Sequence, residues 1–346
     1  MGIITFSRSK RQRKEDMLPL CQGQEAKETV MNETDDRIIE VDKVTVWVIT
    51  DNYYDALRPD TDIATRYRVV PGKSIHAEHG LAYYIETFMN GQISACMFDY
   101  GLDPAGVLNN LELLELDLRK VKAFGLSHGH FDHWMSALTV LKANKDRIDR
   151  GAPFYVGEEV FVRRYSVPPG NADMLDLGQL QKADIEGLGL RVMEVREPVE
   201  IIPGGYLTGN IERITEYEKV PPNLLIRRGD KPEQDDFHGE QALFFHVLGR
   251  GLVVVSGCAH TGIVNTVRHA QRVSGIEKIH AVLGGFHLTN AEPEVIRRTV
   301  ADIKALKPDY VIPTHCTGFE AVVAFGREMP DEFNLNTAGT KYTFSR

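Results

Sequence analysis

The chain has 346 residues, of which 42% are apolar, and its formal net charge at pH 7 is −9. A chain of this length can bury a large core, whereas an acidic surface is poorly suited to nucleic-acid phosphates, which require clustered Lys and Arg. We therefore expect one catalytic domain that binds a small-molecule substrate and no nucleic acid.

The four cysteines, Cys21, Cys96, Cys258 and Cys316, are too few and too scattered for a disulfide framework, which favours a reducing compartment. A basic cluster near the N-terminus is not followed by an apolar stretch of signal-peptide length, and no later stretch is long enough to span a bilayer. These features predict a cytoplasmic protein without a membrane partner.

The sequence pattern of the first half of the chain predicts a flexible tail followed by strands and a helix. Residues 1–40 are polar and lack periodicity, so we place the catalytic domain at 41–346. A β-branched run at 44–49 predicts the first strand. Two further strand-like runs, 81–87 and 92–99, are joined through Asn-Gly, which indicates a hairpin. A helix around 107–114 and a buried strand at 121–126 follow.

That buried strand leads directly into His128-Gly-His130-Phe-Asp132-His133, and apolar spacing from 134 to 141 predicts a helix that has His133 at its N-terminus. Residues 151–236 carry short strand candidates punctuated by Pro and Gly, and such a segment often shapes a substrate pocket. Beyond it lie several further predicted strands, each ending in polar residues: 242–247, 252–255, 281–283 and 310–312.

The spacing of the histidine run suits two metal ions. Residues i and i+2 leaving a strand point the same way, so His128 and His130 can hold one ion. Asp132 and His133 can hold a second ion nearby, which gives a two-metal geometry suited to hydrolysis. Each residue alone is more often structural, since Asp is a common helix N-cap and His beside Gly is often polar surface. Their combination favours a metal site.

The pattern His-x-His-x-Asp-His after a buried strand resembles the metallo-β-lactamase superfamily, over roughly residue 44 to the C-terminus. The resemblance implies an α/β fold, a four-layer αββα sandwich, with two divalent metal ions in a shallow groove. The ions are usually zinc and sometimes iron or manganese. Asp99-Tyr-Gly101 stands where the superfamily has its Asp-x-Gly turn, which implies that Asp99 supports the ligands from behind.

The superfamily normally adds a third His for the first ion, a bridging Asp at a strand end and a final His for the second ion. In this chain Cys258 stands where the bridging Asp is expected, and it could bridge the ions or only pack, since hydroxide alone can bridge. We assign His260 to the first ion, with His238 as the competing candidate. His315 matches the final His.

Other polar residues could contact a metal or the substrate. His287 ends a predicted strand at the same edge, although it could equally cap a helical turn, and His79 precedes a strand that could line the groove. The arginine pairs at 163–164 and 227–228 could hold anionic groups, but paired arginines are more often solvated surface.

A narrower resemblance lies in Ser256-Gly-Cys-Ala-His260-Thr-Gly-Ile263, Leu283-Gly-Gly-Phe-His287 and Pro313-Thr-His-Cys-Thr-Gly318. These segments are similar to the dihydropterin-ribofuranosylaminobenzene-phosphate synthase family. Its activity joins a dihydropterin carbon to a ribofuranosylaminobenzene phosphate with loss of diphosphate, in the route to tetrahydromethanopterin. Many relatives are regarded only as hydrolases, so the resemblance specifies the metal chemistry better than the substrate.

We therefore expect a dinuclear metal enzyme, a hydrolase or a synthase-like transferase, whose substrate is small and phosphate-bearing or otherwise anionic. The metal pair would act as a Lewis acid, and Asp132 could shuttle a proton. Two alternatives are weighed against this hypothesis. A di-iron redox protein would usually carry an appended flavin domain, for which the chain offers no room, and a non-catalytic metal-binding protein would be expected to lose ligands.

Overall fold

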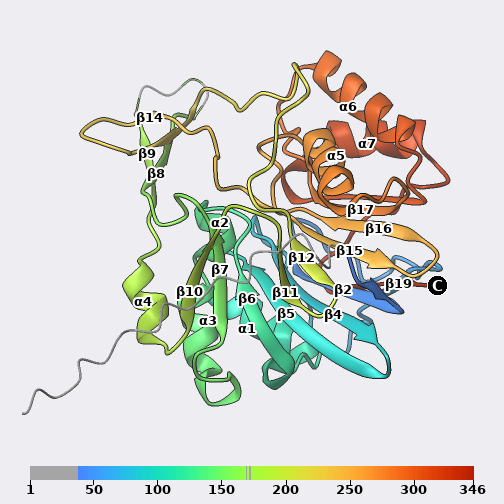
Figure 1. Ribbon diagram of the computed structural model, residues 1–346, viewed down its shortest axis with the longest axis horizontal. Coiled ribbons are helices and arrows are strands. Elements are labelled where there is room, and N and C mark those ends of the chain that lie inside the picture. The colour runs from blue at the N-terminus through green and yellow to red at the C-terminus, as the bar shows by residue number, and fades with distance from the viewer. Residues whose placement is uncertain (1–37, 169, 171–172) are drawn as a thin grey trace, which may run out of the picture.

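The computed structural model describes residues 38–168, 170 and 173–346. Two β-sheets pack face to face, and helices cover the outer face of each sheet, which gives four layers (Figure 1). The predicted αββα sandwich is therefore confirmed. Most of the predicted tail lies outside the described residues, but Ile38 is already buried and Glu40 begins the first strand.

The first sheet has eight strands in the order β10-β7-β6-β5-β4-β2-β19-β3. Their bounds in that order are Arg191–Val195, Pro153–Gly157, Val121–Gly125, Gln92–Tyr100, Ala82–Met89, Lys43–Thr50, Thr340–Ser345 and Ala64–Arg66. The hairpin between β4 and β5 turns at Asn90 and Gly91, which both have positive φ, as the Asn-Gly pair predicts.

The second sheet has the order β11-β12-β15-β16-β17-β18, and β1 pairs with β15. Their bounds are Val199–Ile202, Gly205–Leu207, Leu243–Val247, Gly251–Val255, Ile279–Gly285 and Tyr310–Thr314, with β1 at Glu40–Val41. Strands β16, β17 and β18 are parallel. Their carboxyl ends therefore meet at one edge of the sheet, where polar residues follow each strand.

The helices divide between the two outer faces. Helices α1 (Pro104–Leu113), α3 (Ala137–Ala143) and α4 (Lys182–Gly187) pack on the first sheet. Helices α5 (Ile263–Ser274), α6 (Pro293–Ala305) and α7 (Phe319–Glu328) pack on the second. The remaining helical segments are short: α2 (Phe131–Trp134) and the 3-10 turns Leu118–Lys120, Lys145–Arg147 and His315–Thr317. Within the described ranges, no helix combines the length and apolar composition needed to cross a bilayer.

Alternation along the strands explains the layers. In β16, Val253 and Val255 face the core between the sheets, whereas Leu252 and Val254 pack against the helices. Because both faces of such a strand are covered, its sequence is continuously apolar instead of alternating with polar residues. This accounts for the unbroken runs from which the strands were predicted.

A small third sheet projects from the sandwich (Figure 1). Its strands, in the order β14-β13-β8-β9, are Glu233–Gln234, Leu224–Ile226, Arg164–Ser166 and Leu175–Gly178. It belongs to the irregular 151–236 segment. The other difference from prediction is that the helix after the histidine run is broken, since α2 ends at Trp134 and α3 begins at Ala137.

Because only one of two isoleucines lies in the core between the sheets, we expect their alanine variants to differ in stability. Ile85 on β4 is fully buried in this core, whereas Ile93 on β5 is 48% exposed. We expect Ile85→Ala to lower the free energy of unfolding by about 3 kcal/mol, because it removes buried methyl groups and leaves a cavity. Ile93→Ala should change it by under about 0.5 kcal/mol. Urea unfolding followed by circular dichroism measures both, and equal losses would contradict the assigned core.

Candidate metal centre

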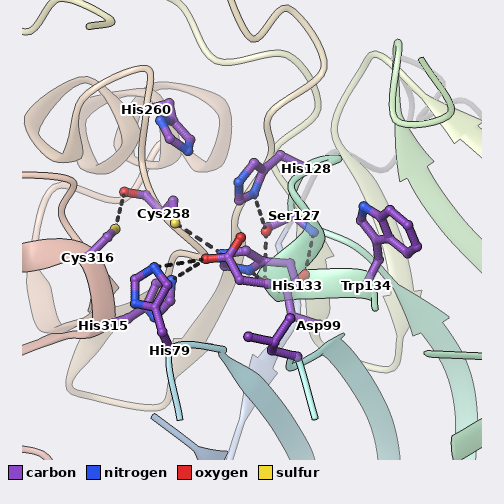
Figure 2. A network of polar contacts seen from close by, with 12 residues as sticks. His79, Asp99, Ser127, His128, His133, Trp134, Cys258, His260, His315 and Cys316 are labelled. Atoms are coloured by element: carbon purple, nitrogen blue, oxygen red, sulfur yellow. Dashed lines mark hydrogen bonds and ion pairs between the residues drawn. The ribbon is translucent and has the colours of Figure 1, made fainter. Parts of the chain in front are cut away.

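Buried donor atoms gather at the edge where the strands of both sheets end (Figure 2). They form two main groups whose ligand atoms lie within 4.8 Å of one another. The members of the first group are His128, His130 and His260, and those of the second are Asp132, His133, Cys258 and His315. A further overlapping group comprises Cys258, His260 and His287. The structure thus brings together all six residues predicted to bind metal, together with Cys258.

The strand ends explain how residues distant in sequence meet. His128 and His130 follow β6, and His130 occupies the N-cap position of α2, which carries Asp132 and His133. Cys258 and His260 follow β16, His287 follows β17, and His315 follows β18. Each of the two main groups therefore draws residues from both sheets, so that it forms only when the sandwich is assembled.

Two glycines allow close approach at this edge, one between the two sheets and one between neighbouring strands of the second sheet. A Cβ atom at Gly257 would lie 2.1 Å from Ser127 Oγ, and one at Gly285 would lie 2.5 Å from the Gly257 carbonyl oxygen. Neither position has space for a side chain. These glycines let the end of β16 approach the histidine run and place Cys258 beside His133.

The first group offers neutral imidazole nitrogens. The Nε2 atoms of His128 and His130 and both ring nitrogens of His260 are buried without a hydrogen-bond partner among the described residues. Burial lowers the pKa of all three histidines well below the usual value. An uncharged imidazole with an unused lone pair is the form that binds a metal ion, so these residues fit one.

The second group combines a carboxylate, a thiol and two imidazoles. His133 Nε2 lies 3.0 Å from Cys258 Sγ, and His315 Nε2 lies 3.1 Å from Asp132 Oδ2. Burial alone would raise the pKa of Asp132, but the charges of His133 and His315 hold it well below its usual range. Asp132 is therefore ionised. One nitrogen of each ring, the carboxylate and the sulfur converge on one point, which is a donor set suited to zinc.

Asp99 supports ligands of both groups. Its Oδ2 atom lies 2.7 Å from His133 Nδ1 and also accepts a 2.7 Å hydrogen bond from Ser127 Oγ. Ser127 Oγ in turn lies 2.9 Å from His128 Nδ1. Because the hydroxyl proton points to the carboxylate, the oxygen is left to accept from His128 Nδ1. Both rings therefore keep Nε2 free for a metal ion, as a supporting carboxylate does in metalloproteins.

Asp51 and Asn52 place His315, whose backbone has positive φ. The Asp51 carboxylate accepts a 2.9 Å hydrogen bond from the His315 amide, and Asn52 donates to the His315 carbonyl oxygen. The same Asn52 side chain contacts His79 Nδ1 at 3.3 Å. The His79 ring stacks on His315 (Figure 2), and its Nε2 lies 3.7 Å from Asp132 Oδ2. Since 61% of its side chain is exposed, His79 lies at the mouth of the second group.

Glu240 fixes the segment that carries Cys258 and His260. Its buried carboxylate accepts hydrogen bonds from the amides of His260 and Thr261, at 2.7 and 2.6 Å. Between the two ligands, Ala259 adopts a positive φ of 53°. This turn directs both side chains toward the histidine run. His287 also has positive φ, and its ring centroid lies 3.9 Å from that of His260, beside the first group.

The structure separates the two candidates for the third histidine of the first group. His260 lies in the cluster, whereas the side chain of His238 is 65% exposed and pairs with Asp236. The residue of that segment that reaches the centre is Phe237, whose ring stacks on His260 at 3.9 Å. Sequence analysis identified this segment but not Phe237, because its spacing carries no signal for an aromatic contact.

The paired arginines are engaged elsewhere. Arg164 is buried and its guanidinium pairs with Asp235, while Arg163 pairs with Asp176. Arg228 contacts Glu159, Glu233 and Asp236, and Arg227 lies over the ring of Tyr165. The hypothesis that these pairs hold an anionic substrate finds no support in this arrangement, because Arg163, Arg164 and Arg228 already pair with carboxylates and Arg227 lies over an aromatic ring.

No protein-family model matches the chain. It is 33% identical over 266 residues to the 7,8-dihydropterin-6-methyl-4-(β-D-ribofuranosyl)-aminobenzene-5'-phosphate synthase of Methanocaldococcus jannaschii, covering 76% of this chain and 89% of the synthase. The chain belongs to the metallo-β-lactamase superfamily, in the family of this synthase.

Two other proteins are similar to the chain. An uncharacterized protein of the same archaeon is 29% identical over 261 residues, covering 72% of this chain and 88% of its own length. The crystal structure of a metal-dependent hydrolase of the β-lactamase superfamily has a TM-score of 0.68 and 24% identity, covering 88% of this chain and 100% of the hydrolase. The latter similarity supports the fold.

We expect substitutions of His260 and His238 to have different effects on the metal content of the protein. His260→Ala should lower bound zinc by about one equivalent, because the first group loses one of its three donors. His238→Ala should leave the zinc content unchanged, since that side chain lies in solvent. Elemental analysis of the dialysed proteins measures both variants. Loss of zinc from His238→Ala with retention in His260→Ala would reverse our assignment.

The sulfur of Cys258 predicts a spectroscopic difference between the groups. Cobalt bound to a thiolate absorbs in the near ultraviolet through sulfur-to-metal charge transfer, whereas cobalt bound by histidine nitrogens shows only weaker visible bands. We expect the cobalt-loaded protein to show the charge-transfer band and Cys258→Ser to lack it. Cys96→Ser is a matched control, because Cys96 is buried in the core between the sheets. A band that persists in Cys258→Ser would exclude this thiolate as a ligand.

Proposed function

We propose that the chain is a dinuclear metal-dependent enzyme that acts as a synthase-like transferase on a phosphate-bearing substrate. The observation that carries this proposal is the pair of adjacent buried donor groups, one built from nitrogens alone and one from a carboxylate, a thiol and imidazoles. Family membership supports the transferase assignment. Hydrolysis of a small anionic substrate is the second candidate, since the same donors suit both reactions.

The donor set fits two divalent cations, with zinc favoured by the combination of imidazole and thiol. His128, His130 and His260 would hold one ion, and Asp132, His133, Cys258 and His315 the other. When bound, the ions supply Lewis acidity, which stabilises the negative charge that develops on a departing diphosphate or phosphate. In the first group, neutral ligands leave the positive charge of the ion largely uncompensated, which favours an anionic substrate.

The proposed reaction balances as a substitution at carbon. A bond forms between the dihydropterin methyl carbon and the aminobenzene nitrogen, while the bond from that carbon to a diphosphate oxygen breaks. The nitrogen loses one proton. We propose that the Asp132 carboxylate accepts this proton, or the proton of an attacking water in the hydrolytic alternative.

Two further histidines are placed to contact the substrate. His79 lies at the exposed side of the second group, with its Nε2 facing Asp132. His287 lies beside His260, and its buried Nδ1 has no hydrogen-bond partner among the described residues. We propose that these rings take the role considered for the arginine pairs and hydrogen-bond the anionic oxygens of the substrate.

His130 provides the direct test of this function. His130→Ala should lower kcat/KM by at least about a thousandfold, because the variant loses a metal ligand and with it several kcal/mol of charge stabilisation. The assay supplies a dihydropterin diphosphate and a ribofuranosylaminobenzene phosphate and measures diphosphate release. His246→Ala is the control, since His246 pairs with Glu40 away from the centre.

The same assay separates the two candidate reactions. Release of diphosphate only when both substrates are present supports the transferase, whereas release from the pterin alone supports the hydrolase. Full activity in His130→Ala would contradict the proposed centre. Activity that requires redox-active iron in place of zinc would contradict both reactions.

A further inference from the structure

Arg164 and Asp235 form a buried ion pair beneath the small sheet. Arg164 begins β8, and its Nε donates a 2.7 Å hydrogen bond to Asp235 Oδ2. Only 3% of the Arg164 side chain and 0% of the Asp235 side chain are exposed. Arg164 Nη1 also donates to the carbonyl oxygens of Glu159 and Val162, at 2.9 and 3.1 Å. A buried pair with this many hydrogen bonds has one well-defined position.

The guanidinium of this pair lies against the middle of the histidine run. A Cβ atom at Gly129 would lie only 2.1 Å from Arg164 Nη1 and 2.6 Å from the carbonyl oxygen of Val160. Gly129 is the residue between His128 and His130, and its carbonyl oxygen accepts a 3.0 Å hydrogen bond from Trp134 Nε1. The backbone between two ligands of the first group is therefore clamped between Arg164 and Trp134.

The Asp235 carboxylate is linked to the first group by a second route, through Phe237. Asp235 Oδ1 accepts a 2.9 Å hydrogen bond from the amide of Phe237, a residue with a positive φ of 51°. The Phe237 ring stacks on His260, with planes 13° apart, and meets the edge of His130 at 5.0 Å between centroids. By binding the Phe237 amide, Asp235 fixes the ring that packs against His260 and His130.

We propose that the Arg164–Asp235 ion pair is a positioning device that sets the metal affinity of the first group and leaves the second group unaffected. Its two arms reach the first group through Gly129 and through Phe237, and among the described residues neither Arg164 nor Asp235 bonds to a ligand of the second group. His133 and His315 in the second group are held instead by Asp99 and Asp51. The inference rests on metal binding by both groups, as the proposed function requires.

The pair also connects the small sheet to the metal centre. Arg164 lies in β8, and Asp235 directly follows β14, at opposite ends of the order β14-β13-β8. A displacement of these strands therefore changes the position of Phe237 and Gly129. This connects the irregular segment 151–236, a kind of segment that often shapes a substrate pocket, to the metal ligands.

Asp235→Asn tests the proposal with minimal change of shape. An asparagine has one oxygen, so it cannot accept from both Arg164 Nε and the Phe237 amide, and one arm is lost. We expect the cobalt affinity of the first group to fall about tenfold or more, the usual effect of losing a residue that positions ligands. The cobalt–thiolate charge-transfer band, which reports the second group, should titrate as in the native protein.

A second variant covers the case in which Asp235→Asn does not fold. Phe237→Leu leaves the ion pair intact but removes the ring that stacks on His260, and it should also weaken the first group selectively. Asp236→Asn is the matched control for the neighbouring exposed carboxylate, which pairs with Arg228 and His238, and it should bind cobalt as the native protein does.

The titrations separate the possible failures. Native protein that binds no cobalt would contradict the proposed function itself. If the native protein fills both groups and Phe237→Leu and Asp235→Asn do so with unchanged affinities, the positioning role is overturned. Equal weakening of both groups would also overturn it, because it would show a general effect on the fold.

Discussion

The centre depends on one buried carboxylate, that of Asp99. It binds His133 directly and His128 through the hydroxyl of Ser127, so that one charge orients a ligand in each metal group. A buried carboxylate is costly unless its oxygens are hydrogen-bonded, and here Oδ1 accepts from the Ser127 amide while Oδ2 serves the two side chains. The requirement to satisfy this charge and the requirement to orient the ligands are met by the same contacts.

The candidate metal ligands come from both sheets, and Asp99 lies in the first. Asp99 lies in β5 and the histidine run follows β6, in the first sheet, whereas Cys258, His287 and His315 follow parallel strands of the second. The core between the sheets therefore determines the distance between the two halves of each ligand group. Gly257 allows the final approach, because a side chain there would collide with Ser127 at the strand end of the other sheet.

Local pattern was sufficient to predict the strands, the hairpin at Asn90-Gly91 and the histidine run, since these depend on neighbours in the sequence. It favoured His260 but left His238 as a competing candidate, because the choice depends on where the end of β16 and the Phe237 turn meet. Apolar periodicity also did not reveal the break between α2 and α3 or the hydrogen bond that Trp134 donates to the Gly129 carbonyl oxygen.

The chain departs from the usual superfamily ligands at Cys258, where a bridging Asp is expected. The sulfur lies within the second group and also belongs to the overlapping group with His260 and His287. A thiol here favours soft cations over hard, oxygen-seeking ones. The residue that differs most from the superfamily pattern thus lies among the candidate metal ligands.

The two-metal centre is tested most directly by a crystal structure of the zinc-loaded protein with anomalous diffraction data at the zinc edge. The account predicts two anomalous peaks, one among His128, His130 and His260 and one among Asp132, His133, Cys258 and His315. A single peak, or a peak bound by His238 in place of His260, would contradict it.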